Sequence, residues 1–96
     1  MAYHLTGAAQ EDLIEISVTG IENFGASQAR RYHDALFEVF DLLAANPKMA
    51  RERVEFTTPC RIHWFQSHVI IYQIEGGDIR IIRVRHGRED WFSDPT

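Results

Sequence analysis

The chain has one cysteine, three prolines, no excess of positive charge and no long apolar run among its 96 residues. Because the single Cys60 cannot form an internal disulfide, the fold must be held by its core, and we expect a reducing compartment, the cytoplasm. Cys60 itself is expected to be a small buried apolar residue. No apolar run approaches the roughly 20 residues that span a bilayer, and the N-terminus lacks a signal-peptide pattern. We therefore expect no membrane partner.

The charge balance limits the kind of partner. Fourteen acidic residues against ten basic ones give a net charge of −4. Proteins that bind nucleic acid along the phosphate backbone are usually basic, so no direct sequence-specific nucleic-acid binding is expected. The basic residues gather at Arg30 and Arg31, at 48–53 and at 80–88. This clustering leaves room for a local cationic rim.

The five histidines do not have the spacing of a metal site, and no cysteine pair accompanies them. They are His4, His33, His63, His68 and His86. The sequence predicts no metal ion and no cofactor.

Local signals predict the order strand, helix, helix, strand, strand, strand. Thr6 is a predicted N-cap for the first helix, Gly25 suits the left-handed residue after it, and Ser27 is a predicted cap for the second helix. Asn46-Pro47 stops the second helix, because a residue before proline avoids helical geometry. The predicted strands are 2–6, 60–66, 68–75 and 78–85, with an irregular segment over 48–59.

Short connections favour an antiparallel helical hairpin on one face of a mainly antiparallel sheet, with the last three strands forming a meander. The sequence thus predicts an α+β fold in one domain, residues 1–96. We expect the sheet face opposite the helices to carry Arg61, His63 and one of the arginine sets of the last strand.

The second helix has a wide apolar stripe that includes Leu36, Phe37, Phe40 and Leu43. One interpretation is a groove that a partner's amphipathic helix completes. A helix buried on three sides within the chain explains the same width.

The last strand runs from apolar residues into a cationic end. In period two, Ile79 and Ile81 share a face with Arg83 and Arg85, whereas Ile82, Val84 and His86 share the other face. Two guanidinium groups at the rim, with Arg88 beyond the turn, suit carboxylates, phosphates or a partner protein. Surface ion pairs with Glu and Asp are the alternative.

The ending Ile-Ile-Arg-Val-x-His-Gly-Arg-x-Asp, after the strand His68-Val69-Ile70-Ile71-Tyr72-Gln73-Ile74, resembles the ParE branch of the RelE/ParE toxins. The resemblance extends through Tyr3-His4-Leu5-Thr6, Ala9-x-x-Asp12-Leu13-x-x-Ile16, Phe24-Gly25 and Leu42-Leu43-Ala44-Ala45-Asn46-Pro47, and covers residues 2 to about 91. It implies the same α+β architecture. It also implies a toxin of a type II toxin–antitoxin pair that poisons DNA gyrase and is held inactive by a ParD-like antitoxin.

A toxin that acts by binding relies on interface anchors, for which exposed Arg and Trp are typical. The candidate target-binding residues are Arg83, Arg85, His86, Arg88 and Trp91. The candidate antitoxin-binding residues are Leu36, Phe37, Phe40 and Leu43.

The enzymatic alternative is ribosome-dependent mRNA cleavage of the RelE type. It requires a base, cations for the phosphate and an acid, and the candidates are Arg61, Arg83 and His86, with Glu52 or Glu55 nearby. The loop 51–53 lacks a lysine pair, and no tyrosine follows the last strand. A third hypothesis is a non-toxic adaptor on the same fold.

Overall fold

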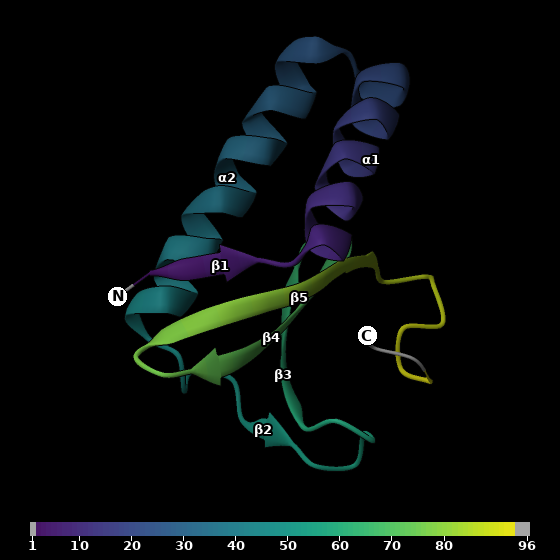
Figure 1. Ribbon diagram of the computed structural model, residues 1–96. Coiled ribbons are helices and arrows are strands. Elements are labelled where there is room, and N and C mark those ends of the chain that lie inside the picture. The colour runs from purple at the N-terminus through teal and green to yellow at the C-terminus, as the bar shows by residue number, and fades with distance from the viewer. Residues whose placement is uncertain (1, 94–96) are drawn as a thin grey trace.

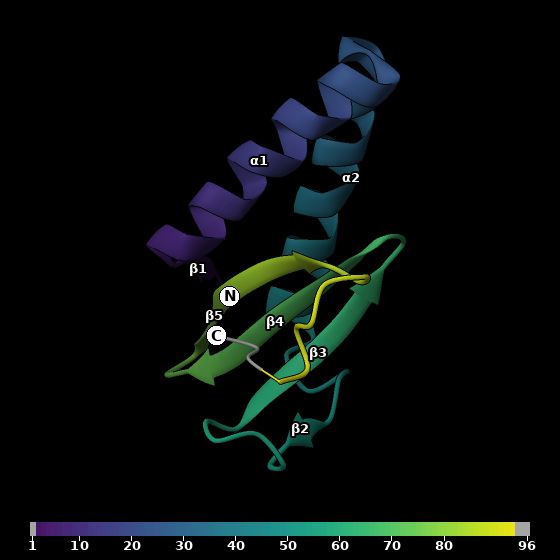
Figure 2. The same ribbon diagram turned by 90° about the vertical axis from the view of Figure 1, so that its right-hand side faces the viewer.

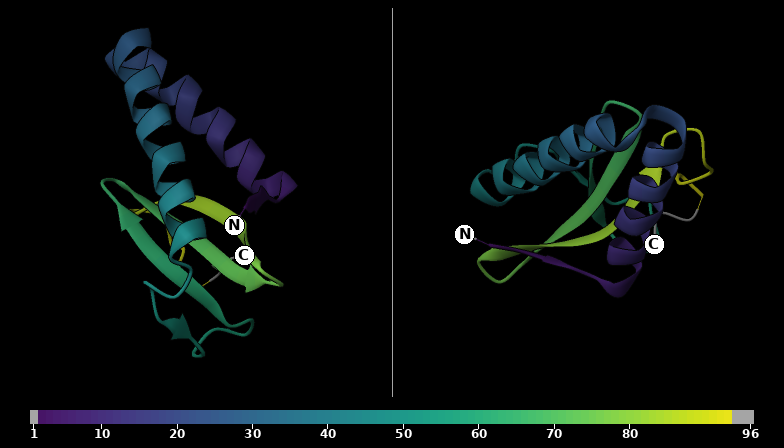
Figure 3. Two further views of the ribbon diagram at one scale, coloured as in Figure 1. Left: turned by 90° about the vertical axis from the view of Figure 1, so that its left-hand side faces the viewer. Right: turned by 90° about the horizontal axis from the view of Figure 1, so that it is seen from above.

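A hairpin of two helices covers one face of a five-stranded sheet, and the C-terminal segment crosses the other face (Figures 1, 2 and 3). The computed structural model describes residues 2–93. The elements are β1 (Tyr3–Leu5), α1 (Gly7–Phe24), α2 (Ala26–Ala45), β2 (Glu52–Arg53), β3 (Cys60–Phe65), β4 (His68–Glu75) and β5 (Asp78–His86). The strand order is β1-β5-β4-β3-β2. The predicted α+β architecture is confirmed.

The helix boundaries follow local chemistry. The Thr6 hydroxyl accepts a hydrogen bond from the backbone N–H of Ala9 at 3.0 Å, which confirms the predicted N-cap. Gly25, with φ of 85°, connects the two helices by itself. Because α2 already begins at Ala26, the predicted cap at Ser27 is wrong, and Gly25 occupies that position without a side-chain bond. Asn46 ends α2, and both its backbone and side-chain amides donate to the carbonyl of Leu42.

The three-strand meander β3–β4–β5 is antiparallel, and β1 joins it in parallel beside β5. The register pairs Tyr3 with Ile79 and Leu5 with Ile81. The prediction that 48–59 is wholly irregular was wrong, because β2 pairs with β3 there. Two residues are too few to leave a period in the sequence.

A bulge in β5 changes which residues face the helices. Ile81 pairs with Tyr72 and Arg83 pairs with Ile71, so Ile82 is the extra residue. The alternation predicted through this strand is therefore wrong beyond Ile82. Val84 joins Ile81 on the helix side, and Ile82 packs on the opposite face.

Each face of the sheet has its own apolar cluster. We call the one under the helices the helix-side cluster; it contains Ala9, Leu13, Leu36, Phe40, Leu43, Ala44, Ile70, Tyr72, Ile79, Ile81 and Val84. The back cluster on the other face contains Phe56, Cys60, Ile62, Val69, Ile71, Ile82 and Trp91. Cys60 is buried, as predicted.

The structure corrects the expected position of Arg61 and His63. Arg61 lies across from Tyr72, and His63 lies across from Ile70. Because cross-strand partners point to the same face and Tyr72 and Ile70 belong to the helix-side cluster, Arg61 and His63 are also on the helix side.

Candidate functional site

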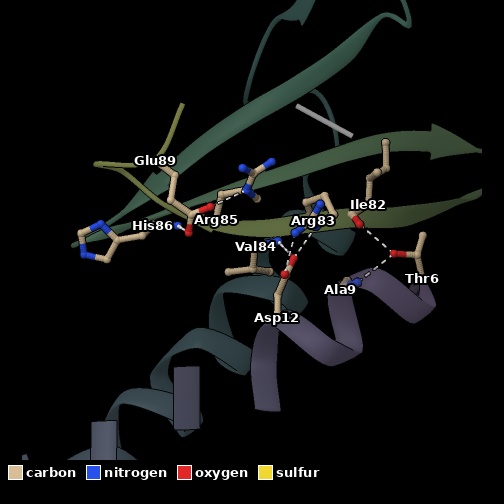
Figure 4. A network of polar contacts seen from close by, with 9 residues as sticks. All are labelled: Thr6, Ala9, Asp12, Ile82, Arg83, Val84, Arg85, His86 and Glu89. Carbon is tan, nitrogen blue, oxygen red and sulfur yellow. Dashed lines mark hydrogen bonds and ion pairs between the residues drawn. The ribbon is translucent and has the colours of Figure 1, made fainter. Parts of the chain in front are cut away.

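The cationic end of β5 continues beyond β1, and side chains close its edge there (Figure 4). The Thr6 hydroxyl donates to the carbonyl of Ile82 at 2.7 Å. The Asp12 carboxylate accepts from the backbone N–H of Val84 at 3.0 Å. One residue pair further along, the Glu89 carboxylate accepts from the backbone N–H of His86 at 3.1 Å. These side chains satisfy backbone groups that a neighbouring strand would otherwise pair.

Arg83 is held by Asp12 of α1. Its Nε lies 2.7 Å from one carboxylate oxygen and its terminal nitrogen 2.8 Å from the other. This two-point geometry is the strongest form of an Arg–carboxylate contact, and both side chains are largely buried, at 24% and 12% exposure. Arg83 therefore connects α1 to β5 through an ion pair. This is the alternative to a binding role that the sequence left open for the arginines of this strand.

Arg85 is paired in a similar way with Glu89. The Arg85 Nε donates to Glu89 at 2.8 Å, and the backbone N–H of Glu89 donates to the carbonyl of His86 at 3.0 Å. The hydrogen bond from Arg85 lowers the pKa of the Glu89 carboxyl. The turn after β5 is thus fixed by an ion pair at its base.

His86 stands next to a second imidazole at the end of the sheet. The backbone N–H of Arg88 donates to Nδ1 of His86 at 3.0 Å, so the proton of a neutral His86 ring is on Nε2. The His68 ring lies edge-on to it at 5.2 Å, and the Tyr32 hydroxyl of α2 is 2.6 Å from Nδ1 of His68. Burial lowers the pKa of His68, and the neighbouring His86 adds to this effect. At neutral pH His68 is therefore an uncharged ring.

Trp91 is not the exposed anchor that we expected. It is 8% exposed within the back cluster, and its ring meets Trp64 edge-on at 5.7 Å. The two aromatic residues in ring contact with Trp91, Trp64 and Phe92, face solvent instead, at 52% and 54% exposure. Trp64 also lies against Gly87, where a Cβ atom would come within 2.6 Å of its ring. A large aromatic residue just before a turn was the sequence signal for Trp64.

Of the predicted target-binding residues, Arg88 is the one that is exposed. Arg83, Arg85 and His86 are partly buried and Trp91 is buried. The five residues do lie together around the end of β5 and the turn that follows it.

The residues considered for RNA cleavage do not converge. Arg61 donates to the carbonyl of Ala50 at 2.6 Å on the helix side. His86 is on the same side but pairs with His68, four residues along β4 from the partner of Arg61, or roughly 13 Å away by strand geometry. The backbone of Arg83 pairs with Ile71, a residue of the back cluster, and the Arg83 side chain is hydrogen-bonded to Asp12 of α1. The two candidate bases Glu52 and Glu55 lie near β2, and Glu55 is within 4 Å of Arg51 and Arg53.

The structure also corrects the predicted groove on α2. Leu36, Phe40 and Leu43 have no exposed surface and belong to the helix-side cluster. Phe37 is partly buried and stacks on His33, with the ring centres 4.5 Å apart. The stripe is wide because α2 packs against both β1 and β5 as well as α1. In the structure, α2 is therefore buried on three sides within the chain, which was the alternative explanation for the wide stripe.

An exposed apolar surface occurs instead on α1, which sequence reasoning missed. Ile14, Val18 and Ile21 are 64%, 49% and 51% exposed. Their spacing of four and three residues was the available signal, because it places them on one face of a helix. The opposite side of α1 lines a groove of about 550 Å³, together with α2, the turn between β3 and β4, and the end of β5.

Among residues 2–93, no cluster of three or more His, Cys, Asp or Glu side chains is suited to a metal ion. In the same part of the chain, none of the helices is both long and apolar enough to cross a membrane.

Comparison with known proteins agrees with this fold. The sequence profile of the family described as ParE toxin of type II toxin-antitoxin system, parDE, matches residues 3–91. A search of curated proteins found no match. Among solved structures, the chain is similar to one described as the chromosomal ParDE TA system from P. aeruginosa. The TM-score is 0.74 at 21% identity, over 90% of this chain and 95% of that chain.

The likeness in structure supports the fold, and the profile match spans nearly the whole chain. The chain belongs to the ParE toxin family of type II toxin–antitoxin systems.

Proposed function

We propose that this toxin acts in the cytoplasm by binding DNA gyrase, without catalysis, and that a ParD-like antitoxin neutralises it. One observation supports binding over catalysis: the cations expected to act on a phosphate are held in internal contacts. Arg83 is fixed by Asp12, and Arg61 lies at the far end of the helix side from His86. An RNA-cleaving site would need such groups around one phosphate.

The proposed target-binding surface is the turn after β5. Arg88 makes the direct contact, because it is exposed and follows Gly87, which lies against the exposed Trp64 ring. Arg and aromatic residues are the usual anchors of protein interfaces. The other predicted residues position this surface. Arg85 fixes the turn through Glu89, His86 accepts from the N–H of Arg88, and the buried Trp91 supports Trp64.

The proposed antitoxin contact on α2 is reduced to Phe37, with Leu36, Phe40 and Leu43 holding it in place from the core. Phe37→Glu should weaken the complex about tenfold or more if the antitoxin desolvates this ring. Titration calorimetry with the cognate antitoxin measures this, with Asp34→Lys on the exposed face of α2 as the control for a charge change.

The target is tested with purified toxin in two reactions run in parallel. One measures supercoiling and DNA cleavage by gyrase, and the other measures mRNA cleavage in a translation mixture. We expect inhibition or trapped cleaved DNA in the first, intact mRNA in the second, and no effect once antitoxin is added.

Variants connect the effect to the surface. Arg88→Ala should weaken inhibition about 5-fold to 100-fold, whereas Arg31→Ala, which removes an exposed arginine from α2, should leave it unchanged. Cleavage of mRNA without any gyrase effect would replace this proposal by the enzymatic one.

A further inference from the structure

The turn after β5 is organised around His86, whose ring extends from the end of the strand (Figure 4). The backbone N–H of His86 donates to the Glu89 carboxylate at 3.1 Å, and its carbonyl accepts from the backbone N–H of Glu89 at 3.0 Å. The ring accepts a further bond at Nδ1, from the backbone N–H of Arg88 at 3.0 Å. His86 is therefore joined to the turn through its N–H, its carbonyl and its ring.

The contact at the ring depends on the charge of the imidazole. A neutral imidazole has one nitrogen that donates and one that accepts, whereas a protonated imidazole has two donors. Protonation of His86 would put a hydrogen on Nδ1, opposite the N–H of Arg88 at a separation of 3.0 Å. Two donors that face each other repel, so the ring and the backbone of Arg88 must move apart. Histidine is the side chain that changes charge between about pH 5 and 8.

A neighbouring contact in the same turn has no such dependence. The backbone N–H of Gly87 donates to the carbonyl of Ser67 at 2.8 Å, and a carbonyl does not titrate. The turn therefore contains two adjacent backbone amides, of which one is held by a titratable ring and the other by the backbone. This pair provides an internal control.

The groups around the His86 ring come from both helices, from β4 and from the turn. The His68 ring of β4 lies edge-on at 5.2 Å, and burial lowers its pKa, so it takes up a proton at lower pH than an ordinary histidine does. The hydrogen bond from Arg85 lowers the pKa of the Glu89 carboxyl, so Glu89 stays ionised where imidazoles titrate. The other titratable groups that line the same groove are Asp12 and Glu15 of α1 and Tyr32 and His33 of α2.

We propose that His86 is a pH-dependent positioning residue: its neutral ring holds the turn in the form that presents Arg88, and protonation of the ring releases the backbone of Arg88. The release is a property of the toxin alone. Its consequence, weaker binding of the target at low pH, rests on the proposed function, in which the exposed Arg88 makes the direct contact. The two are therefore tested separately.

The release is tested on the full-length toxin by NMR. The nitrogen chemical shifts of the His86 ring and the solvent exchange of backbone amides are followed from about pH 8 to about pH 5.5, with each exchange rate divided by its intrinsic rate. At the higher pH we expect a neutral ring with the proton on Nε2. As the ring takes up a second proton, the protection of the Arg88 amide should fall about 2-fold to 10-fold, which corresponds to one hydrogen bond. The Gly87 amide should keep its protection.

Two variants separate the charge of the ring from its size. His86→Asn has Oδ1 attached to Cγ, as Nδ1 is in histidine, and this oxygen accepts a hydrogen bond without titrating. The protection of Arg88 should then be the same at both ends of the pH range. His86→Phe keeps a ring but removes the acceptor, so the protection should be low at both ends. Circular dichroism confirms the fold of each variant.

The consequence for the target is measured as the affinity of the toxin for gyrase bound to DNA at the same two pH values. Because gyrase is the same in every measurement, each toxin is compared with itself. The loss of affinity toward low pH should be about 2-fold to 10-fold larger for the wild type than for His86→Asn. If Arg88 is released as expected but the toxin does not bind gyrase at either pH, the proposed target is wrong and the positioning role of His86 stands.

Three results would overturn the positioning role. The first is a His86 ring that carries its proton on Nδ1 at the higher pH. The second is protection of the Arg88 amide that does not change while the ring becomes protonated. The third is a loss of protection that His86→Asn or the Gly87 amide shows to the same extent, which would mean that the whole turn or the whole fold opens at low pH.

Discussion

The two faces of the sheet are covered in different ways. On the helix side, α1 and α2 bury Leu36, Phe40 and Leu43 completely. On the back, the cover is the loop before β3 and the segment after β5, which bring Phe56 and Trp91 onto the strands at 8% exposure. The helix side is a continuous core, whereas the back is closed by irregular segments, which we expect to open at lower free energy than the whole fold. The proposed target-binding turn belongs to this second kind of structure.

The largest expected effect is on the helix side. Phe40→Ala should lower the free energy of unfolding by about 4 kcal/mol, because it leaves a cavity between α2 and the sheet. Denaturant unfolding measures this. Phe92→Ala, at an exposed aromatic residue of the back, should change stability by less than about 0.5 kcal/mol. A similar loss in the free energy of unfolding for both variants would show that the two faces of the sheet contribute equally to stability.

The junction between α1 and β5 should come next. Asp12→Ala should cost about 3 kcal/mol, since it removes the carboxylate that accepts from the largely buried Arg83 and from the N–H of Val84. Glu15 lies about one helical turn after Asp12 and is exposed, so Glu15→Ala is the control and should leave the free energy of unfolding nearly unchanged. Chemical denaturation of both variants makes the comparison. An unchanged Asp12 variant would mean that the helical hairpin is held by apolar contacts alone.

A smaller and more local effect is expected at the back. Trp91→Ala should cost about 2 kcal/mol, less than a full core truncation, because a loop cover can collapse into the space. Cys60 lies under this cover at 1% exposure, and burial raises the pKa of its thiol, so it should react slowly in the folded protein. Trp91→Ala should accelerate thiol labelling in native buffer well beyond what the loss of global stability accounts for. If the rate of Cys60 labelling followed the free energy of unfolding in both Trp91→Ala and Phe40→Ala, the back of the sheet would not open separately from the rest of the fold.

The smallest expected effect is the pH dependence of the helix side. The pKa of His68 is lowered from 6.5 by burial, so the unfolded chain takes up this proton first as the pH falls. The stability that neutral His68 contributes is present above pH 6.5 and is lost as the pH falls from there toward the lower pKa of the folded state. His68→Gln should flatten the fall in stability between about pH 7.5 and 5.5 by roughly 1 kcal/mol or less.

Local signals in the sequence were sufficient for both helices and for the strands other than β2. Thr6, Gly25 and Asn46 act at the positions where their own side chains or backbone preferences operate, so each could be predicted without knowing the fold. The bulge at Ile82 could not, because it depends on how β5 is paired with β4. That one residue decides which face each later side chain takes.

The site was harder to predict for a related reason. Arg83, Arg85 and Trp91 have residue types that favour interfaces, but their partners Asp12, Glu89 and Trp64 come from other segments or from the far side of a turn. The resemblance to the family gave the fold and the class of toxin. It gave no information about which of these side chains the fold itself would use.

The parallel pairing of β1 with β5 joins the first strand of the chain to the last. During synthesis the helical hairpin can form early, but the strands that cover Leu36, Phe40 and Leu43 follow later. Roughly 40 residues separate the end of α2 from Val84. At a synthesis rate of ~5–20 residues per second, the apolar face of α2 stays uncovered by the sheet for roughly 2–8 s. We therefore expect the nascent chain to expose this apolar face until its final strand has emerged, and to be open to chaperone binding in that interval. A chain that ends before β5 would lack the strand that joins β1 to the sheet.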